Sequence, residues 1–271
     1  MRSEILINRK GVDQSSKNDT TPKGGVSVIR TNQEFSITFD DKPTLPALIS
    51  LIRTLRSASG TMTLSGSKLA KSNLTPQNTF LTIAQLALDT LESEADATFK
   101  SQLNLFSNAN SDKHDLPEDL MPLARLNLTG KDVPSALMQV VNANVKNLVS
   151  IGQTMAMRLC FLSIPEKFSW PDANIEKGDT LDECLPKDAE YWLSILYETA
   201  FAMKSPLYHH GTIIIPETIT GTIPGKTQLP FHRLIYPLAP ASDRPHNYRI
   251  LSVACITDHE SITDHENQPI I

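Results

Sequence analysis

The chain has little glycine, little cysteine and few aromatic residues for its length. Its 271 residues include 11 Gly against 18 Pro, which argues against glycine-rich phosphate-binding loops and favours a chain interrupted by extended segments. The three cysteines, Cys160, Cys184 and Cys255, lie far apart, form no C-x-x-C pair and stand in apolar contexts. We interpret them as small buried hydrophobic residues in a reducing compartment.

Clustered positive charge and long apolar runs are also missing. The formal net charge is −5, which gives no electrostatic footprint for nucleic acid. Residues 1–16 lack the apolar core of a signal peptide. The longest apolar run, Leu148 to Pro165, is interrupted by Gln153 and Arg158, which makes it too polar to span a bilayer. We therefore expect a cytoplasmic protein that binds neither nucleic acid nor membrane.

Motifs of nucleophilic catalysis are absent as well. No G-x-S-x-G occurs, and no cysteine stands in an electropositive setting that would lower its pKa. The acidic pairs Glu118-Asp119 and Asp182-Glu183 stand at predicted helix starts, where negative charge offsets the helix dipole. The sequence thus predicts no catalytic residue, and it leaves any cofactor unknown.

The first 110 residues read as a polar arm followed by helices. Residues 1–34 are rich in Ser, Asn, Thr and Lys and predict a flexible arm, with short edge strands at Glu4–Ile7 and Val26–Ile29. After a brief strand at 35–39, apolar spacing and a proline in the first turn predict a helix at 45–56 and another at 75–94, which continues or restarts to Phe106. The polar stretch 57–74 between these helices predicts a loop. We expect a mostly helical segment over 35–110.

The C-terminal part has clearer signals. A long helix to about Met203 follows Pro186, and Pro206 ends it. Strands are predicted at 207–215, 231–238 and 248–256, whereas 148–164 is ambiguous between strand and buried helix. A helix followed by consecutive strands with short connections implies an antiparallel sheet with helices on one face, and hence the α+β class.

The sequence motifs of this part resemble those of a known sensory family. A glycine precedes an acidic turn at Gly178-Asp179-x-Leu181-Asp182, a break at Lys204-Ser205-Pro206 follows the helix, and the next strands carry Arg233-Leu234-x-x-Pro237-Leu238 and Arg249–Ile256. These motifs are similar to those of the divergent PAS domains found in alphaproteobacterial single-domain proteins. The likeness covers residues 178–257 and, at fewer positions, 116–177. It implies a PAS-like domain over 111–257 and leaves 258–271 as a mobile tail.

The resemblance implies a five-stranded antiparallel sheet with helices folded across one face and a small-molecule pocket between them. By position, the side chains that would line such a pocket are Trp192, Leu196, Ile213, Leu234 and Tyr236. The other interpretation of these five residues is ordinary core. Arg233 would either anchor an anionic ligand at the mouth of the pocket or pair with Asp179, Asp182 or Glu183, because an unpaired buried charge is costly.

Three functions are compatible with these features. The first is a non-catalytic sensory or regulatory protein that binds a small molecule or a signalling partner, with output through homodimerisation or partner contact. The second is a metal-dependent enzyme that uses His210, Glu217 and His232; His209 and His210 point to opposite faces of a strand and cannot share an ion. The third is a protein-interaction module whose surface is formed by the helices at 45–56 and 76–106.

Overall fold

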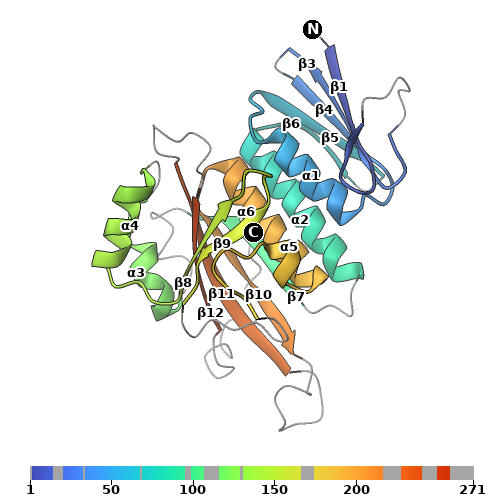
Figure 1. Cartoon of the computed structure of the whole chain (residues 1–271). Coiled ribbons are helices and arrows are strands. Elements are labelled where there is room, and N and C mark those ends of the chain that lie inside the picture. Colours follow the sequence, from blue (N-terminus) through green and yellow to red (C-terminus); the bar gives the residue numbers. More distant parts are fainter. Residues whose placement is uncertain are drawn as a thin grey trace, which may run out of the picture. The chain divides into compact units, whose positions relative to one another are not determined.

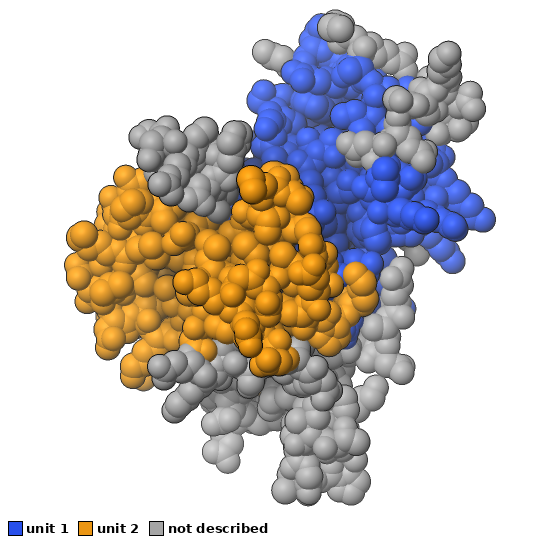
Figure 2. Space-filling model, in the orientation of Figure 1, with its two compact units in different colours: residues 1–94, 188–204 blue, residues 95–187, 205–271 orange. Residues whose placement is uncertain are grey.

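The structure is a computed structural model in which two compact units are distinguished (Figures 1 and 2). The residues that it describes are 2–14, 21–32, 34–67, 69–94, 99–106, 116–128, 131–165, 174–215, 227–239 and 249–256. Unit 1 comprises residues 1–94 and 188–204, and unit 2 comprises residues 95–187 and 205–271. Each unit contains a six-stranded sheet of its own.

Unit 1 combines a mixed sheet with three helices. Its strands are β1 (Arg2–Ile7), β2 (Asp13–Gln14), β3 (Val26–Thr31), β4 (Glu34–Phe39), β5 (Thr61–Gly66) and β6 (Leu69–Leu74). Its helices are α1 (Leu45–Leu55), α2 (Pro76–Glu94) and, except for its first residue, α6 (Lys187–Met203). The strand order is β2-β1-β3-β4-β5-β6. Only β4 and β5 pair in parallel, because α1 crosses over between them.

The core of unit 1 lies between the sheet and its helices. Strand β4 buries Phe35, Ile37 and Phe39 on one face and exposes Glu34 and Ser36 on the other. Helix α1 buries seven of its eleven residues, so its apolar face belongs to this core. We expected this helix to offer a partner surface in the interaction-module hypothesis; its apolar side chains are instead packed inside the unit.

A buried ion pair connects α1 and α6 within unit 1. The Glu198 carboxylate is fully buried, and it accepts a hydrogen bond of 2.7 Å from Nε of Arg53. Arg56 forms a second ion pair with the same carboxylate, and its guanidinium lies 5.2 Å from the centre of the Phe201 ring. A buried carboxylate needs such partners because its desolvation is otherwise uncompensated.

The prediction of a mostly helical N-terminal segment is wrong, because this part of the chain is rich in strands. Within the expected arm 1–34, β1 and β3 contain the expected edge strands Glu4–Ile7 and Val26–Ile29, and β2 is an addition; the expected loop 57–74 contains the hairpin β5–β6. Strand β6 is exposed at four of its six positions, so it lacks the apolar alternation by which a half-buried strand is recognised. The second helix ends at Glu94, and residues 99–105 form a strand.

Unit 2 combines an antiparallel sheet with short helices. Its strands are β7 (Phe99–Leu105), β8 (Leu148–Gln153), β9 (Leu159–Ser163), β10 (Leu207–Ile215), β11 (Thr227–Leu238) and β12 (Arg249–Ile256). Its helices are the 3₁₀ turn η2 (Glu118–Leu120), α3 (Met121–Ala124), α4 (Val133–Asn142) and α5 (Leu181–Cys184). The order is β7-β10-β11-β12-β8-β9, and every neighbouring pair is antiparallel.

Several expectations for this part are met. The α+β class is confirmed, and the three C-terminal strands form where the alternating pattern predicts them. The ambiguous stretch 148–164 is a hairpin of β8 and β9. Residues 216–226, between β10 and β11, and the tail from 257 onwards lie outside the described residues. None of the helices that the structure describes is long and apolar enough to cross a membrane.

One face of the unit 2 sheet is covered by η2, α3 and α4, and we call it the α3/α4 face. Asp132 caps α4 by accepting a hydrogen bond of 2.9 Å from the backbone N–H of Ser135. The main buried contributors from the helical side are Leu120, Leu123, Ala124, Val133, Ala136 and Val140. Those from the sheet are Tyr208, Leu234, Tyr236, Leu238, Leu251, Val253 and Cys255.

Candidate functional site

The six residues expected at a pocket are distributed over both units. Trp192 and Leu196 lie in α6 of unit 1 and are fully buried. The others belong to unit 2, on β10 and β11: Ile213, Arg233, Leu234 and Tyr236. Side chains alternate along a strand, so Leu234 and Tyr236 lie on the α3/α4 face, whereas Arg233 leaves the sheet on the opposite face. Of the expected set, the structure brings Leu234 and Tyr236 together on this face.

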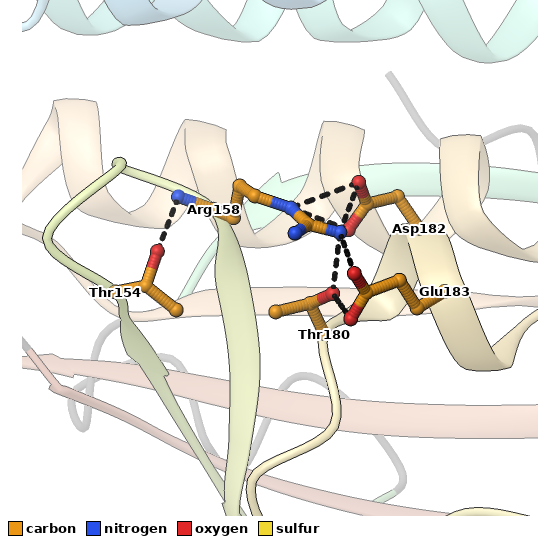
Figure 3. Close-up of polar contacts among 5 residues, drawn as sticks. All are labelled: Thr154, Arg158, Thr180, Asp182 and Glu183. Atoms are coloured by element: carbon orange, nitrogen blue, oxygen red, sulfur yellow. Dashed lines mark hydrogen bonds and ion pairs between the residues drawn. The ribbon is translucent and has the colours of Figure 1, made fainter.

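Two of the acidic residues expected to pair with Arg233 bind a different arginine (Figure 3). Arg158, at the end of the β8–β9 turn, donates from Nε to both oxygens of Asp182 at 3.1 and 3.0 Å and from Nη2 to Asp182 Oδ2 at 2.7 Å. The same Nη2 lies 2.9 Å from an oxygen of Glu183 and donates to the Thr180 hydroxyl at 2.8 Å. The Thr180 hydroxyl in turn donates to Glu183 at 2.7 Å.

This network shifts the titration of its members. Hydrogen bonds to Asp182 and Glu183 raise the pKa of Arg158. Burial alone would raise the pKa of Asp182, but hydrogen bonds from Arg158 and Thr180 outweigh it and lower that pKa. The hydrogen bond from Thr180, followed by that from Arg158, lowers the pKa of Glu183. Both carboxylates therefore stay ionised, and the network joins the β8–β9 turn to α5 as a structural clamp.

A second polar cluster lies at one end of the α3/α4 face. His210 and His232 are direct cross-strand neighbours with ring centres 6.4 Å apart, and the Tyr208 ring stacks on both. The Tyr208 hydroxyl and Nδ1 of His232 are hydrogen-bonded at 2.6 Å. Burial, and then the nearby His210, lower the pKa of His232. Burial therefore favours the neutral form of His232, whose ring stacks on that of His210.

The opposite face carries His209, as the alternation of a strand requires. His209 lies across from Arg233 and packs against the ring of Phe231, with ring centres 4.9 Å apart. Burial, followed by the charges of Arg233 and His210, holds the pKa of His209 well below its ordinary value. The register thus places His209 and His210 on opposite faces of β10.

For a metal, the described residues contain no group of three or more His, Cys, Asp or Glu side chains placed to hold an ion. His210 and His232 do lie together, but Glu217, the third expected ligand, lies outside the described residues. The cysteines carry no sign of activation either. Burial raises the pKa of Cys184 and of Cys255 to about 11 each, which leaves both thiols protonated at neutral pH.

Two hydroxyl groups on the α3/α4 face are buried without hydrogen bonds. Tyr236 is 1% exposed and Ser150 is 3% exposed, and neither hydroxyl has a hydrogen-bond partner among the residues that the structure describes. Both residues flank Leu251, their cross-strand partner, so they point to the same face. Because nearly all buried polar groups in proteins are paired, two unpaired hydroxyls in one row mark a place where a polar partner belongs.

The surroundings of these hydroxyls are apolar. The Phe106 ring meets the Tyr236 ring edge to face, with centres 6.1 Å apart, and α3 and α4 cover the row. Burial raises the pKa of Tyr236 above its ordinary range, so the phenol stays a hydrogen-bond donor. An apolar lining with a few convergent polar groups is the general composition of small-molecule sites.

Of the two residues with buried hydroxyls, Ser150 and Tyr236, sequence reasoning identified one. Tyr236 was expected at a pocket through the family resemblance, whereas Ser150 had no signal beyond its place in an apolar run. Comparison with known proteins adds no further residue: no family model, no curated protein and no solved structure matches the chain.

Proposed function

We propose that the chain is a non-catalytic regulatory protein of PAS-like type whose unit 2 binds a small molecule on the α3/α4 face of its sheet. The observation that carries the proposal is the pair of buried, unpaired hydroxyls of Ser150 and Tyr236. Leaving a hydroxyl buried without a partner costs about 1–3 kcal/mol. A ligand whose polar atoms form hydrogen bonds with these two hydroxyls would recover that free energy, whereas the ligand-free protein would not.

The strand arrangement supports the same proposal. Strands β8 to β12 are five consecutive antiparallel strands, and the first of them pairs with the last. The PAS resemblance implies a five-stranded antiparallel sheet, to which β7 is added here beyond β10. Regulatory output would then pass through a second copy or a signalling partner.

The cover of the α3/α4 face is suited to opening. It consists of a 3₁₀ turn of three residues, a helix of four and a helix of ten. Helices this short have little stability of their own and depend on packing against the sheet. A ligand could therefore enter between cover and sheet without disturbing the strand pairing.

The experiment is native mass spectrometry of the purified protein, compared with its denatured mass. We expect a bound small molecule in wild type and its loss in the double variant Ser150→Ala/Tyr236→Phe. Hydrogen exchange provides a second readout, because an occupied site should slow exchange in α4. A molecule retained at full occupancy by the double variant would place binding elsewhere and contradict the proposal. The proposal would also be contradicted if the wild-type protein carried no bound molecule and hydrogen exchange in α4 were equally fast in the wild type and the double variant.

A further inference from the structure

Arg249, the first residue of β12, adds a third buried donor beside the two hydroxyls. Its Nε is buried and has no hydrogen-bond acceptor among the described residues. Within the same ranges, ion pairs are formed by Arg53, Arg56 and Arg158, and none is formed by Arg249. A buried N–H of a guanidinium that lacks an acceptor is costly, so this position also calls for a partner.

The register places Arg249 on the α3/α4 face next to both hydroxyls. Arg249 lies across from Gly152 on β8 and from Leu238 on β11. Ser150 and Tyr236 are each two residues further along these neighbouring strands, opposite Leu251. Diagonal neighbours of this kind have Cα atoms roughly 7–8 Å apart, within the reach of an arginine side chain.

Asp132, an acidic residue whose backbone lies close to this part of the sheet, already has hydrogen-bond partners. Asp132 bridges to Ala239, which follows the Leu238 that faces Arg249. Its carboxylate accepts hydrogen bonds from Ser135, and these bonds, rather than an arginine, lower the pKa of Asp132. Asp132 therefore works as the cap of α4, and among the described residues no ion pair joins it to Arg249.

We propose that Arg249, Ser150 and Tyr236 together bind the carboxylate of a small apolar monocarboxylic acid, an assignment that rests on the proposed function of this face. Three donors converge there: one charged N–H and two hydroxyls. Hydrogen bonds between ionised partners are the strong ones, and a carboxylate has enough lone pairs to accept all three. The hydrocarbon part would lie against the apolar side chains of the layer, Leu238 and Leu251 among them.

A monocarboxylate fits better than a phosphate or a neutral molecule. Arg249 offers one positive charge, which balances one carboxylate but not a phosphate dianion in an apolar layer. The oxygen of a neutral alcohol has two lone pairs for three donors and carries no charge to balance the guanidinium. The site therefore predicts discrimination by charge as well as by shape.

The test uses the full chain and three probes: hexanoate, 1-hexanol and inorganic phosphate. We expect hexanoate to bind in isothermal titration and to raise the thermal midpoint, with no effect of 1-hexanol or phosphate at equal concentration. Arg249→Met should weaken hexanoate binding by about 10- to 100-fold, since it removes a charged donor. Arg125→Met, which removes an exposed arginine after α3, is the matched control and should bind hexanoate as wild type does.

The outcomes separate the two proposals. If hexanoate and 1-hexanol bind equally, or Arg249→Met binds hexanoate like wild type, the carboxylate assignment is overturned while the face remains a ligand site. If hexanoate fails to bind and native mass spectrometry shows another molecule that the double hydroxyl variant loses, only the acid is refuted. Hexanoate bound at full strength by Ser150→Ala/Tyr236→Phe refutes both. Arg249→Lys checks folding, because it keeps the charge and should retain part of the affinity.

Discussion

Replacing Tyr236 with phenylalanine should stabilise the ligand-free protein. The substitution removes only a hydroxyl that is buried and has no partner among the described residues, and it keeps the ring that packs against Phe106. Relief of the unpaired hydroxyl is worth about 1–3 kcal/mol. The gap left by one oxygen is smaller than a methyl group and costs at most about 1 kcal/mol. The net expectation is a gain of about 1 kcal/mol.

Tyr208→Phe is the matched control, with the opposite sign. The Tyr208 hydroxyl is hydrogen-bonded to Nδ1 of His232 at 2.6 Å, and the residue lies on the same face of the same sheet. Its removal should cost about 0.5–1.5 kcal/mol. Two substitutions of identical chemistry in one layer are thus expected to move stability in opposite directions, because only one hydroxyl has a partner.

The assay is thermal and urea unfolding of both variants, followed by circular dichroism in carboxylate-free buffer. A change of 1 kcal/mol shifts the midpoint of a domain of this size by about 2–4 °C. Tyr236→Phe should melt higher than wild type and Tyr208→Phe lower. The reasoning is refuted if Tyr236→Phe is as destabilised as Tyr208→Phe, since that would mean that the Tyr236 hydroxyl has a partner in the folded protein.

Three further predictions concern the framework around the site. Glu198→Gln should lower the free energy of urea unfolding by about 3–5 kcal/mol, because it leaves the mostly buried Arg56 without its counter-charge; a loss below 1 kcal/mol would contradict this. Gly211→Ala should speed hydrogen exchange in β7, since a Cβ at this position would overlap the carbonyl of Lys100, and unchanged exchange would argue against the close approach. Asp182→Asn should make the free energy of unfolding fall less steeply as the pH is lowered. Because the pKa of Asp182 is lowered in the folded protein, its stabilisation is present above its ordinary pKa and is lost as the pH falls through the folded value. A pH dependence as steep as that of wild type would disprove the clamp.

The fold of the C-terminal strands could be predicted because their signals are local. Strands β10, β11 and β12 are apolar or alternating, and each is bounded by proline- or glycine-containing turns in the sequence. The opposite orientation of His209 and His210 follows from the period of two alone. These inferences need no knowledge of which strands pair.

Strands β1, β3 and β4 were expected from their sequences, but β2, β6 and β7 could not be predicted because their signals are weak or depend on position in the sheet. Strand β6 is an edge strand exposed at most positions, so nothing in its composition separates it from a polar loop. Strand β2 has only two residues. Strand β7 follows a long helix in the sequence and pairs with β10, about a hundred residues later, which no local pattern encodes.

The candidate site shows the same division between local and long-range information. Ser150 lies on β8, far in the sequence from Tyr236 on β11 and Arg249 on β12, and the pairing of β12 with β8 and β11 gives the three residues a common face. A slip of one residue in either ladder would turn one of the side chains to the opposite face. Tyr236 could be singled out by resemblance, but the positive charge and the second hydroxyl become neighbours through register alone. The site is therefore a property of strand pairing, and substitutions that shift the register of β12 should abolish carboxylate binding even where all three residues are kept.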